Sequence, residues 1–435
     1  MLKASLKAVC VAILTLLPPL FADDWNQWRG PTQNGANDAN NLPASWSVED
    51  GHNIAWIMKL DGEGNSTPVA LNGMVCLTVT VGETRELRAV CVNAKDGQIA
   101  WSKNVGFGRT AARNNMASPS AVTDGKRIFF LFGQGLLTAF SVDGQPLWSR
   151  DLEKEYGGFT QKFGYSSSPL LHDGKLYIPM LHRSPSRKPA SPGDIPDDSW
   201  LLAVNADTGQ TVWKQKRPTL ARGESQDSYS TPIITKHGLI MTGGDLVTCN
   251  NPRTGEELWR YEFVDDDSRR GDWRIVSSPV TDNNLIISAY PRGRQMFAFK
   301  PSRSGKPPEK IWEYTGHVPD VCSPALKDGL LYVLDGVKRY LSCIEVASGR
   351  LVWEEKMDSK AGFYASPTIA DGKIYCLDRH GKIYVWAVGR EPKLLKSFSI
   401  GKEDCCATIT ATGSSLYIRT PSRLICVRKA VGETL

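Results

Sequence analysis

Two adjacent cysteines and one aspartate have the residue types and positions that could carry out chemistry. Cys405 and Cys406 are neighbours, and a disulfide between neighbours requires a strained eight-membered ring. Cys406 occupies the register that Cys322 has in a related segment, and Asp320 lies just before that segment. The Asp320 carboxylate could act as a general base or bind a cation. A single carboxylate is not a complete site, and small residues in a crowded channel are the alternative interpretation of the cysteine pair.

Arginines and aspartates gather in the long connections between the predicted strands, where binding surfaces are often built. These connections are residues 106–116, 153–164, 220–228 and 262–275, and an insertion at 182–199 is expected on the same face. The candidate partner-binding residues are Arg109, Arg113, Arg222, Asp227, Arg269, Arg270, Asp272 and Arg274. A solvated polar rim is the alternative interpretation.

Other catalytic or metal-binding patterns are missing from the sequence. The six histidines are scattered, with no two at a ligand spacing on one element, so structural roles are expected for them. No haem-attachment sequence, Walker loop, dinucleotide fingerprint or nucleophile elbow occurs. We therefore predict no catalytic residues and no metal ligands.

The elements that position these residues come from one pattern that recurs eight times. Each unit has Ser-Pro, an apolar stretch, Asp-Gly or Asn-Gly, a second apolar stretch, and a Thr-Gly turn before a tryptophan. Asn-Gly and Asp-Gly favour tight hairpin turns, and units about 40 to 60 residues long suit four-stranded propeller blades. The prolines that open the units are Pro68, Pro119, Pro169, Pro232, Pro279, Pro324 and Pro367, with Thr408 as a degenerate eighth.

Seven of the 13 tryptophans close a repeat unit, where a large ring would fill the wedge between neighbouring blades. They are Trp56, Trp101, Trp148, Trp213, Trp259, Trp312 and Trp353. Trp56 precedes the first unit, and the last unit has no closing tryptophan, so the N-terminal strand is expected to complete the last blade. The fold prediction is an all-β, eight-bladed β-propeller of four-stranded antiparallel blades, spanning residues 53–435 after an extended lead-in at 23–52.

Composition and charge agree with a globular all-β protein. The chain has 435 residues, 41% of them hydrophobic and 23% charged, with 39 Gly and 26 Pro. Its 52 basic and 46 acidic residues are too evenly balanced to suggest a nucleic-acid binder. No segment has the roughly 20 apolar residues of a transmembrane helix, and we expect a monomer.

Residues 1–22 read as a secretory signal peptide, with two lysines before an apolar stretch, followed by two prolines and by Phe21-Ala22 before Asp23. Export would leave nine cysteines in an oxidising compartment, and an odd number cannot all pair internally. Cys91, Cys249 and Cys343 each lie ten residues before a closing tryptophan, in a slot filled by alanine in another unit. We expect these three to be buried free thiols.

The segment from Ala203 to Trp213, AVNADTGQTVW, resembles the repeat of the pyrroloquinoline-quinone-like (PQQ-like) β-propellers. That family includes quinoprotein alcohol dehydrogenases and outer-membrane assembly proteins of the BamB type. The resemblance to the dehydrogenases implies a vicinal disulfide stacked on the quinone, for which Cys405 and Cys406 are candidates. It also implies Ca²⁺ and an aspartate base, for which Asp320 is the candidate.

Three hypotheses follow. The first, which we favour, is an exported, non-catalytic binding or scaffold module of the cell envelope that uses its loop-rich face to bind a protein or another envelope component and needs no cofactor. The second is a PQQ- and Ca²⁺-dependent dehydrogenase of small alcohols or sugars. The third is a BamB-like outer-membrane assembly factor. The repeat encodes blade packing and does not separate them.

Overall fold

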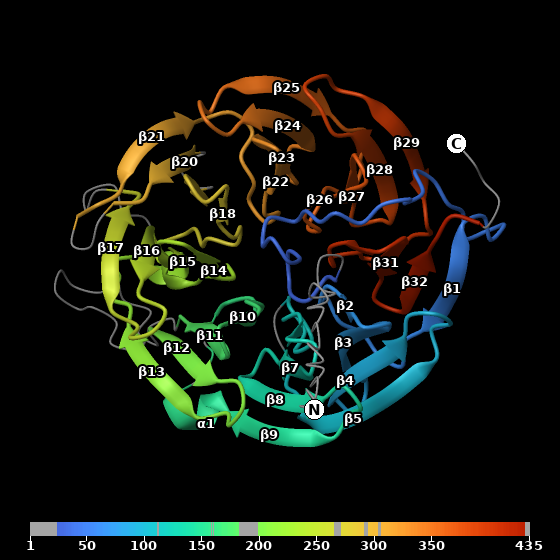
Figure 1. The fold of residues 1–435 in the computed structure, drawn as a ribbon, viewed down its shortest axis with the longest axis horizontal. Coiled ribbons are helices and arrows are strands. Elements are labelled where there is room, and N and C mark those ends of the chain that lie inside the picture. The colour runs from blue at the N-terminus through green and yellow to red at the C-terminus, as the bar shows by residue number, and fades with distance from the viewer. Residues whose placement is uncertain are drawn as a thin grey trace, which may run out of the picture.

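The structure is a computed structural model in which eight four-stranded antiparallel sheets form a ring around a central axis (Figure 1). It describes residues 24–110, 113–157, 159, 161–181, 199–264, 271–290, 295–302 and 306–430. The predicted eight-bladed propeller is confirmed. The predicted signal peptide, residues 1–22, lies outside the described residues.

The blades are numbered along the chain, and their strands run from the axis outward. Blade 1 is β2 (Val69–Leu71), β3 (Met74–Thr80), β4 (Glu86–Asn93) and β5 (Ile99–Phe107). Blade 2 is β6 (Val122–Thr123), β7 (Arg127–Leu131), β8 (Leu136–Ser141) and β9 (Pro146–Asp151). Blade 3 is β10 (Leu170–His172), β11 (Lys175–Met180), β12 (Trp200–Asn205) and β13 (Thr211–Lys216). Blade 4 is β14 (Ile233–Thr235), β15 (Gly238–Gly243), β16 (Leu246–Asn250) and β17 (Glu257–Glu262).

Blades 5 to 8 follow the same order. Blade 5 is β18 (Val280–Thr281), β19 (Ile286–Tyr290), β20 (Gln295–Lys300) and β21 (Glu309–Tyr314). Blade 6 is β22 (Ala325–Lys327), β23 (Leu330–Asp335), β24 (Tyr340–Glu345) and β25 (Leu351–Lys356). Blade 7 is β26 (Thr368–Ala370), β27 (Lys373–Leu377), β28 (Lys382–Ala387) and β29 (Leu394–Ser399). Blade 8 is β30 (Thr410–Thr412), β31 (Ser415–Arg419), β32 (Arg423–Val427) and β1 (Ile54–Lys59).

The two ends of the propeller are joined in blade 8, as the sequence predicted. Strand β1 pairs antiparallel with β32, and Trp56 lies opposite Cys426. The first strand of the ring thus completes the last sheet, which removes the free sheet edge that an open ring would have. The described helical segments are short, α1 (Leu152–Tyr156) and the 3₁₀ turn η1 (Gly223–Gln226), and none could span a membrane.

A closed ring of hydrogen bonds explains why the repeat units open with serine or threonine. In seven blades a hydroxyl side chain adjacent to the opening proline accepts a hydrogen bond from a backbone N–H of the preceding blade. In blade 2 this acceptor is Ser120, which follows Pro119, and in blade 8, which has no opening proline, it is Thr408. Thr408 N–H donates in turn to Thr67 Oγ1 at 3.2 Å, which closes the ring. The members in order are Thr67, Ser120, Ser168, Thr231, Ser278, Ser323, Ser366 and Thr408. All eight blades are therefore tied together around the axis by buried hydrogen bonds.

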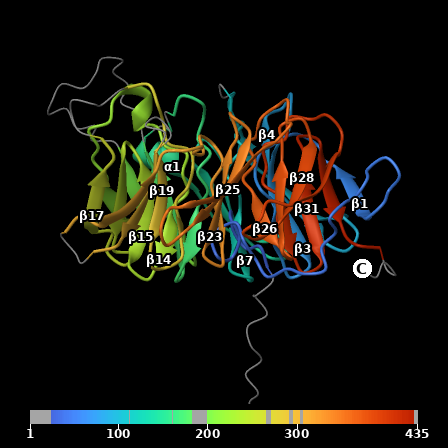
Figure 2. The ribbon, with the colours of Figure 1, turned by 90° about the horizontal axis from the view of Figure 1, so that it is seen from above.

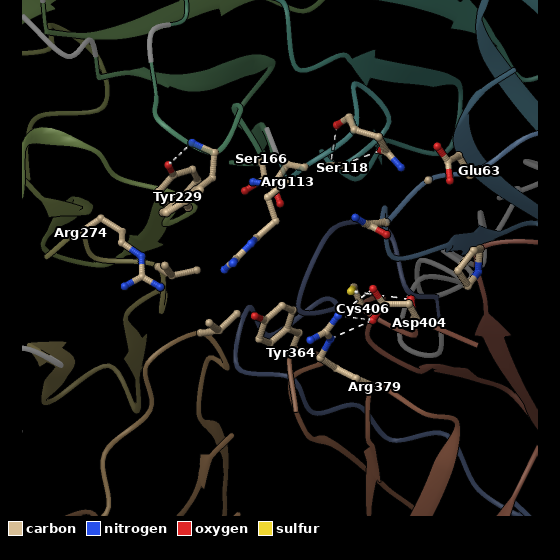
Figure 3. A pocket seen from close by; sticks show the side chains of 18 residues that line it. Glu63, Arg113, Ser118, Ser166, Tyr229, Arg274, Tyr364, Arg379, Asp404 and Cys406 are labelled. Atoms are coloured by element: carbon tan, nitrogen blue, oxygen red, sulfur yellow. Dashed lines mark hydrogen bonds and ion pairs between the residues drawn. The ribbon is translucent and has the colours of Figure 1, made fainter. Parts of the chain in front are cut away.

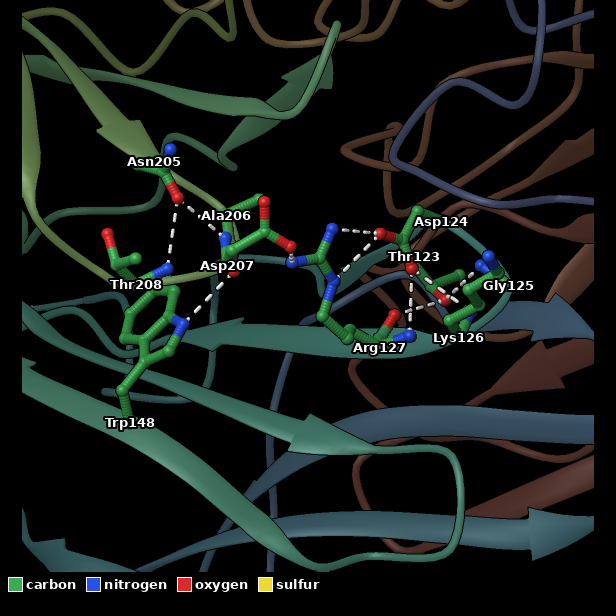
Figure 4. Close-up of polar contacts among 10 residues, drawn as sticks. All are labelled: Thr123, Asp124, Gly125, Lys126, Arg127, Trp148, Asn205, Ala206, Asp207 and Thr208. Atoms are coloured by element: carbon green, nitrogen blue, oxygen red, sulfur yellow. Dashed lines mark hydrogen bonds and ion pairs between the residues drawn. The ribbon is translucent and has the colours of Figure 1, made fainter.

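The Asn-x-Asp-Thr-Gly segment of the repeat forms a turn that its own side chains stabilise (Figure 4). Asn205 Oδ1 accepts hydrogen bonds from the backbone N–H groups of Asp207 and Thr208, at 2.8 and 3.0 Å. This side chain supplies the acceptor of an Asx turn. The Asp207 carboxylate also contacts Arg127 of blade 2, so the turn of one blade is fixed to its neighbour.

The repeat tryptophans pack between blades, as predicted. Within the described part of the chain, six of them donate a hydrogen bond from Nε1 to a backbone oxygen of the next blade; Trp312, for example, donates to Val346 O at 2.8 Å. A glycine of that next blade lies against five of the rings, those of Trp56, Trp101, Trp148, Trp213 and Trp312. At Gly349, whose φ is +70°, a Cβ would lie 2.6 Å from the Trp312 ring. This turn therefore needs glycine both for its backbone conformation and to admit the neighbouring indole.

One cysteine prediction is wrong and two are confirmed. Cys91 is not a free thiol, because it forms a disulfide with Cys76 on the adjacent strand, directly opposite it in the β3–β4 register. Comparison of repeat units placed Cys91 in an alanine-sized slot but did not consider which residue faces it. Cys249 and Cys343 are buried free thiols, as expected.

The two faces of the disc differ (Figure 2). We call the face with the connections that enter the innermost strands the loop face. The N-terminal segment, residues 24–52, runs across the opposite face and crosses the axis (Figures 1 and 2). Its hydrogen bonds reach blades 1, 2, 4, 5, 6, 7 and 8, through Ala70, Thr123, Ile234, Thr281, Leu326, Ile369 and Gly413. At the axis, Arg29 donates to the carbonyl oxygens of Pro324 and Pro367, at 2.6 and 2.9 Å. The central channel is thus covered on this side.

Candidate functional site

A cavity of about 400 Å³ opens at the centre of the loop face (Figure 3). Most of its wall comes from the connections that enter the innermost strands. Six lining residues stand three positions before an opening proline: Asn65, Ser166, Tyr229, Val276, Val321 and Tyr364. The other lining residues are Glu63, Gly64, Arg113, Asn114, Asn115, Ser118, Phe163, Arg274, Arg379, Asp404, Cys406 and Pro421. Because six of the eight blades bring the same position to the cavity, the repeat itself builds much of the wall.

Three arginines from different blades enter this cavity. Figure 3 shows Arg113 extending toward the open centre, with Arg274 and Arg379 on other sides of it. Arg379 forms a two-point ion pair with Asp404, with Nε and Nη2 each 2.8 Å from a carboxylate oxygen. This geometry fixes the plane of the Arg379 guanidinium, which lies 4.6 Å from the centre of the Tyr364 ring.

Arg274 belongs to a network of charges behind the wall. Its Nη2 lies 3.3 Å from Asp320 Oδ2, and its Nε lies 3.8 Å from Glu224 Oε1. Glu224 also pairs with Lys162, with 2.6 Å between Oε2 and Nζ. Burial raises the pKa of Asp320, although the charge of Arg274 opposes that rise. The network holds Arg274 in place from blades 3, 4 and 6.

Phe163 is the apolar centre of the cation-lined side. The charged groups of Arg113, Lys162 and Arg274 lie 5.1, 5.2 and 5.8 Å from its ring centre. Tyr229 accepts a hydrogen bond from the Phe163 backbone N–H at 3.1 Å, which positions this residue. Burial raises the pKa of Tyr229, so its hydroxyl stays neutral. Arginines beside aromatic rings are common in the parts of surfaces that dominate protein binding.

The structure brings only some of the predicted face residues together. Arg113 and Arg274 line the cavity. Arg109 is exposed and pairs instead with Glu153, with 2.7 Å between Nη1 and Oε1. Asp227 is buried and accepts a hydrogen bond from the Lys162 backbone N–H at 3.0 Å.

Four further candidates do not line the cavity or cannot be placed. Arg222 precedes η1, and its carbonyl accepts a hydrogen bond from the Ser225 N–H. Asp272 is exposed outside the cavity. Arg269 and Arg270 lie outside the described residues, as does most of the predicted insertion at 182–199.

The three residues considered for a quinone site, Cys405, Cys406 and Asp320, have different surroundings in the structure. Cys405 is buried and Cys406 lines the cavity, and both are free thiols. Burial raises the pKa of each to about 12, so neither is a thiolate at neutral pH. Asp320 is held by Arg274 and does not line the cavity. Among the described residues, no group of three or more His, Cys, Asp or Glu is placed to hold a metal ion. The three candidate residues therefore do not meet in one place, because Cys406 lines the cavity whereas Asp320 lies outside it.

Most cavity residues were not predicted from the sequence, among them Phe163, Tyr229, Tyr364, Arg379 and Asn65. A signal was present for three of them, because Asn65, Tyr229 and Tyr364 share the position three before an opening proline. Phe163 and Arg379 lie off that register, and only the fold brings them to the axis.

Comparison with known proteins gives the family. Residues 38–177, 108–321 and 309–390 match the family described as outer membrane protein assembly factor BamB. The chain is 25% identical over 385 residues to outer membrane protein assembly factor BamB of Salmonella typhimurium, covering 78% of this chain and 87% of that protein.

Solved structures show the same fold at low identity. A europium-containing methanol dehydrogenase superposes with a TM-score of 0.68 at 11% identity, over 94% of this chain and 98% of that one. BamB from Moraxella catarrhalis superposes with a TM-score of 0.59 at 13% identity, over 88% and 99%. The chain belongs to the family of PQQ-like repeat propellers described as outer membrane protein assembly factor BamB.

Proposed function

We propose that this protein is a non-catalytic scaffold of the cell envelope that helps to assemble envelope proteins by binding a protein segment at the loop-face cavity. One observation carries the proposal. Side chains from several blades, including three arginines and three aromatic rings, converge on one open cavity whose opposite end is covered by the N-terminal segment. This arrangement supports capture of a segment from one side rather than passage through the ring. The family match and the name of the Salmonella relative support assembly as the purpose.

We propose further that the scaffold works without quinone or Ca²⁺. The support is the donor set, because the Asp320 carboxylate is engaged by Arg274 and the two adjacent cysteines are protonated thiols. The rival hypothesis is the PQQ- and Ca²⁺-dependent dehydrogenase. Its support is a likeness of fold to methanol dehydrogenase at 11% identity, which does not carry over an active site.

Export to the envelope remains part of the proposal. The leader at residues 1–22 has the charge and length of a signal peptide. N-terminal sequencing of the protein from envelope fractions should find a chain that starts at Asp23. A chain that keeps Met1 and stays in the cytoplasmic fraction would contradict export.

Site-specific photocrosslinking tests the scaffold function. A photoreactive phenylalanine analogue replaces Tyr364, a half-buried residue of the cavity wall, or, as a control, Leu147 on the outer strand β9, whose side chain is exposed. We expect the Tyr364 position to crosslink to envelope proteins in living cells and the Leu147 position not to. Deleting the gene should also lower the amount of those same proteins in the membrane fraction.

Two outcomes would overturn this function. One is equal crosslinking from both positions, which would remove the cavity as the binding surface. The other is Ca²⁺-dependent binding of pyrroloquinoline quinone in a calorimetric titration, followed by oxidation of alcohols or sugars, which would make the protein a dehydrogenase.

A further inference from the structure

The arginines of the loop-face cavity differ in how their charge is balanced. Arg274 has Asp320 and Arg379 has Asp404 as ion-pair partners. Among the described residues no carboxylate pairs with Arg113, which instead lies over the face of the Phe163 ring. Glu63 also lines the cavity, but Figure 3 shows it on the far side from the Arg113 guanidinium. Arg113 therefore presents an uncompensated planar cation to the centre of the cavity.

A second unbalanced cation lies behind the wall. Arg419 is fully buried at the end of β31, and a Cβ on Gly64, which lines the cavity, would lie 2.1 Å from its Nη2. Its Nη1 donates to Ser66, whereas Nε and Nη2 have no hydrogen-bond partner among the described residues. Burial without a counter-charge lowers the pKa of this guanidinium.

Arg217 shows that hydroxyl and carbonyl oxygens alone can accept the hydrogen bonds of a buried arginine in this protein. Arg217 is equally buried, and its three nitrogens donate to Thr248 and to the carbonyl oxygens of Gly243, Met241 and Leu246. Arg419 has no such set. A buried charge without partners is unfavourable unless an opposite charge comes near it. The Arg419 side of the cavity is therefore a place where an anion would be stabilised.

We propose that the loop-face cavity recognises a carboxylate of the captured protein segment, either its C-terminal carboxylate or an Asp or Glu side chain, through direct contact with Arg113. Arginine suits this task because its planar guanidinium matches the two oxygens of a carboxylate. The Arg419 charge favours the anion through the Gly64 wall, and Tyr364 and Phe163 give the segment apolar surface beside the charge. This inference rests on the proposed scaffold function and adds the chemistry of what is bound.

Fluorescence polarisation with a defined probe tests it. The probe is fluorescein-labelled hexaglutamate, and hexaglutamine with an amidated C-terminus is its uncharged counterpart. We expect the wild-type protein to bind hexaglutamate, and the Arg113→Gln variant to bind it at least roughly tenfold more weakly, because a charge-assisted hydrogen bond is lost. The uncharged hexaglutamine probe should bind weakly to the wild-type protein. Its affinity there should not exceed the affinity of hexaglutamate for Arg113→Gln.

The matched control is Arg109→Gln. Arg109 is an exposed arginine four residues earlier in the same connection, and it pairs with Glu153 outside the cavity. The Arg109→Gln variant loses the same charge as Arg113→Gln, but from a position outside the cavity. The affinity of this variant for hexaglutamate should therefore stay within about twofold of the wild-type affinity. Both positions are exposed, and thermal denaturation checks that both variants fold. Arg113→Lys keeps the charge but loses the planar fork, and should give an intermediate affinity.

Each other outcome overturns the inference. Equal weakening by both glutamine variants would mean general attraction between charges, and no binding of hexaglutamate at 1 mM would mean no carboxylate site. Displacement of the probe by micromolar citrate would identify a free small carboxylate, not a protein segment, as the occupant. Crosslinking from Tyr364 is scored separately, so a scaffold that captures its partner equally well with Arg113→Gln would lose only this inference.

Discussion

Arg274 and Asp320 form an ion pair across the boundary between blades 5 and 6, with 3.3 Å between Nη2 and Oδ2. Each residue lies in the connection that enters the innermost strand of its blade. The pair therefore couples the position of a cavity arginine to the protonation of a carboxylate that does not itself line the cavity.

The first prediction concerns pH. Burial raises the pKa of Asp320 in the folded protein, so the native state holds this proton more tightly than the unfolded chain. The free energy of unfolding that Asp320 contributes should fall as pH rises above its ordinary pKa of about 3.9. As pH rises above that value, the free energy of unfolding of the wild type should fall relative to that of Asp320→Asn. Urea denaturation at a series of pH values measures the difference.

Asp124→Asn is the control with the opposite sign. Burial opposes its ionisation, but hydrogen bonds from Arg127 and from backbone N–H groups outweigh burial and lower the pKa of Asp124. The wild type should gain stability relative to Asp124→Asn as pH rises through that lowered pKa toward about 3.9. The same slope for both variants would contradict the assignment of the two shifts.

The second prediction separates backbone strain from contact between blades. Gly349 and Gly329 have nearly equal φ values of +70° and +73°, but only Gly349 lies against a ring, that of Trp312. Gly329→Ala should destabilise by about 1–2 kcal/mol through strain alone. Gly349→Ala should add about 1–3 kcal/mol, because its Cβ overlaps the indole. Chemical denaturation measures both, and equal losses would show that Trp312 moves aside freely.

The third prediction concerns the disulfide between Cys76 and Cys91. It closes a loop with a sequence separation of 15, so replacing both cysteines by alanine should lower the free energy of unfolding by about 2–4 kcal/mol. Replacing Cys249, a free buried thiol, should lack the loss that comes from opening a loop. Alkylation in denaturant without reductant, read by mass spectrometry, should label Cys249 but neither Cys76 nor Cys91.

The fourth prediction tests the hydroxyl ring around the axis. Ser323→Ala removes the acceptor for the Ser278 backbone N–H, which is 2.8 Å from Ser323 Oγ in a buried site. An unsatisfied buried donor should lower the free energy of unfolding by about 1–3 kcal/mol. Ser397→Ala, on the exposed outer strand β29, should change it by less than about 0.5 kcal/mol. A Ser323→Ala protein as stable as the wild type would show that the ring contributes little.

The fold could be predicted because the same sequence pattern recurs in each blade. The Ser-Pro and Asn-Gly signals mark where each innermost strand begins and turns, and the orphan Trp56 shows that β1 must complete blade 8. The same comparison explains the error at Cys91. It aligned residues of equivalent units, whereas the disulfide depends on which residue faces Cys91 across the β3–β4 pair.

The cavity residues were harder to predict from the sequence, because the cavity is formed by side chains from different repeat units. Arg113 and Arg274 stood out as charges in long connections, but nothing distinguished them from Arg109, which turns away to Glu153. Arg379 lies in the turn between β27 and β28 rather than in a long connection. Its approach to the axis depends on the geometry of the whole ring.

The pairing of β1 with β32 also sets an order in time. Strand β1 is made before every other strand of the propeller, yet its partner is made last. The residues that cross the axis, including Arg29, likewise wait for blades 6 and 7, which supply their acceptors. During synthesis, strand β1 therefore stays unpaired, and the N-terminal segment that crosses the axis lacks its hydrogen-bond acceptors, until almost the whole chain has left the ribosome. We expect the final step of folding to be a closure that completes the last sheet and the hydroxyl ring together, and to be slow because its contacts are so distant in sequence.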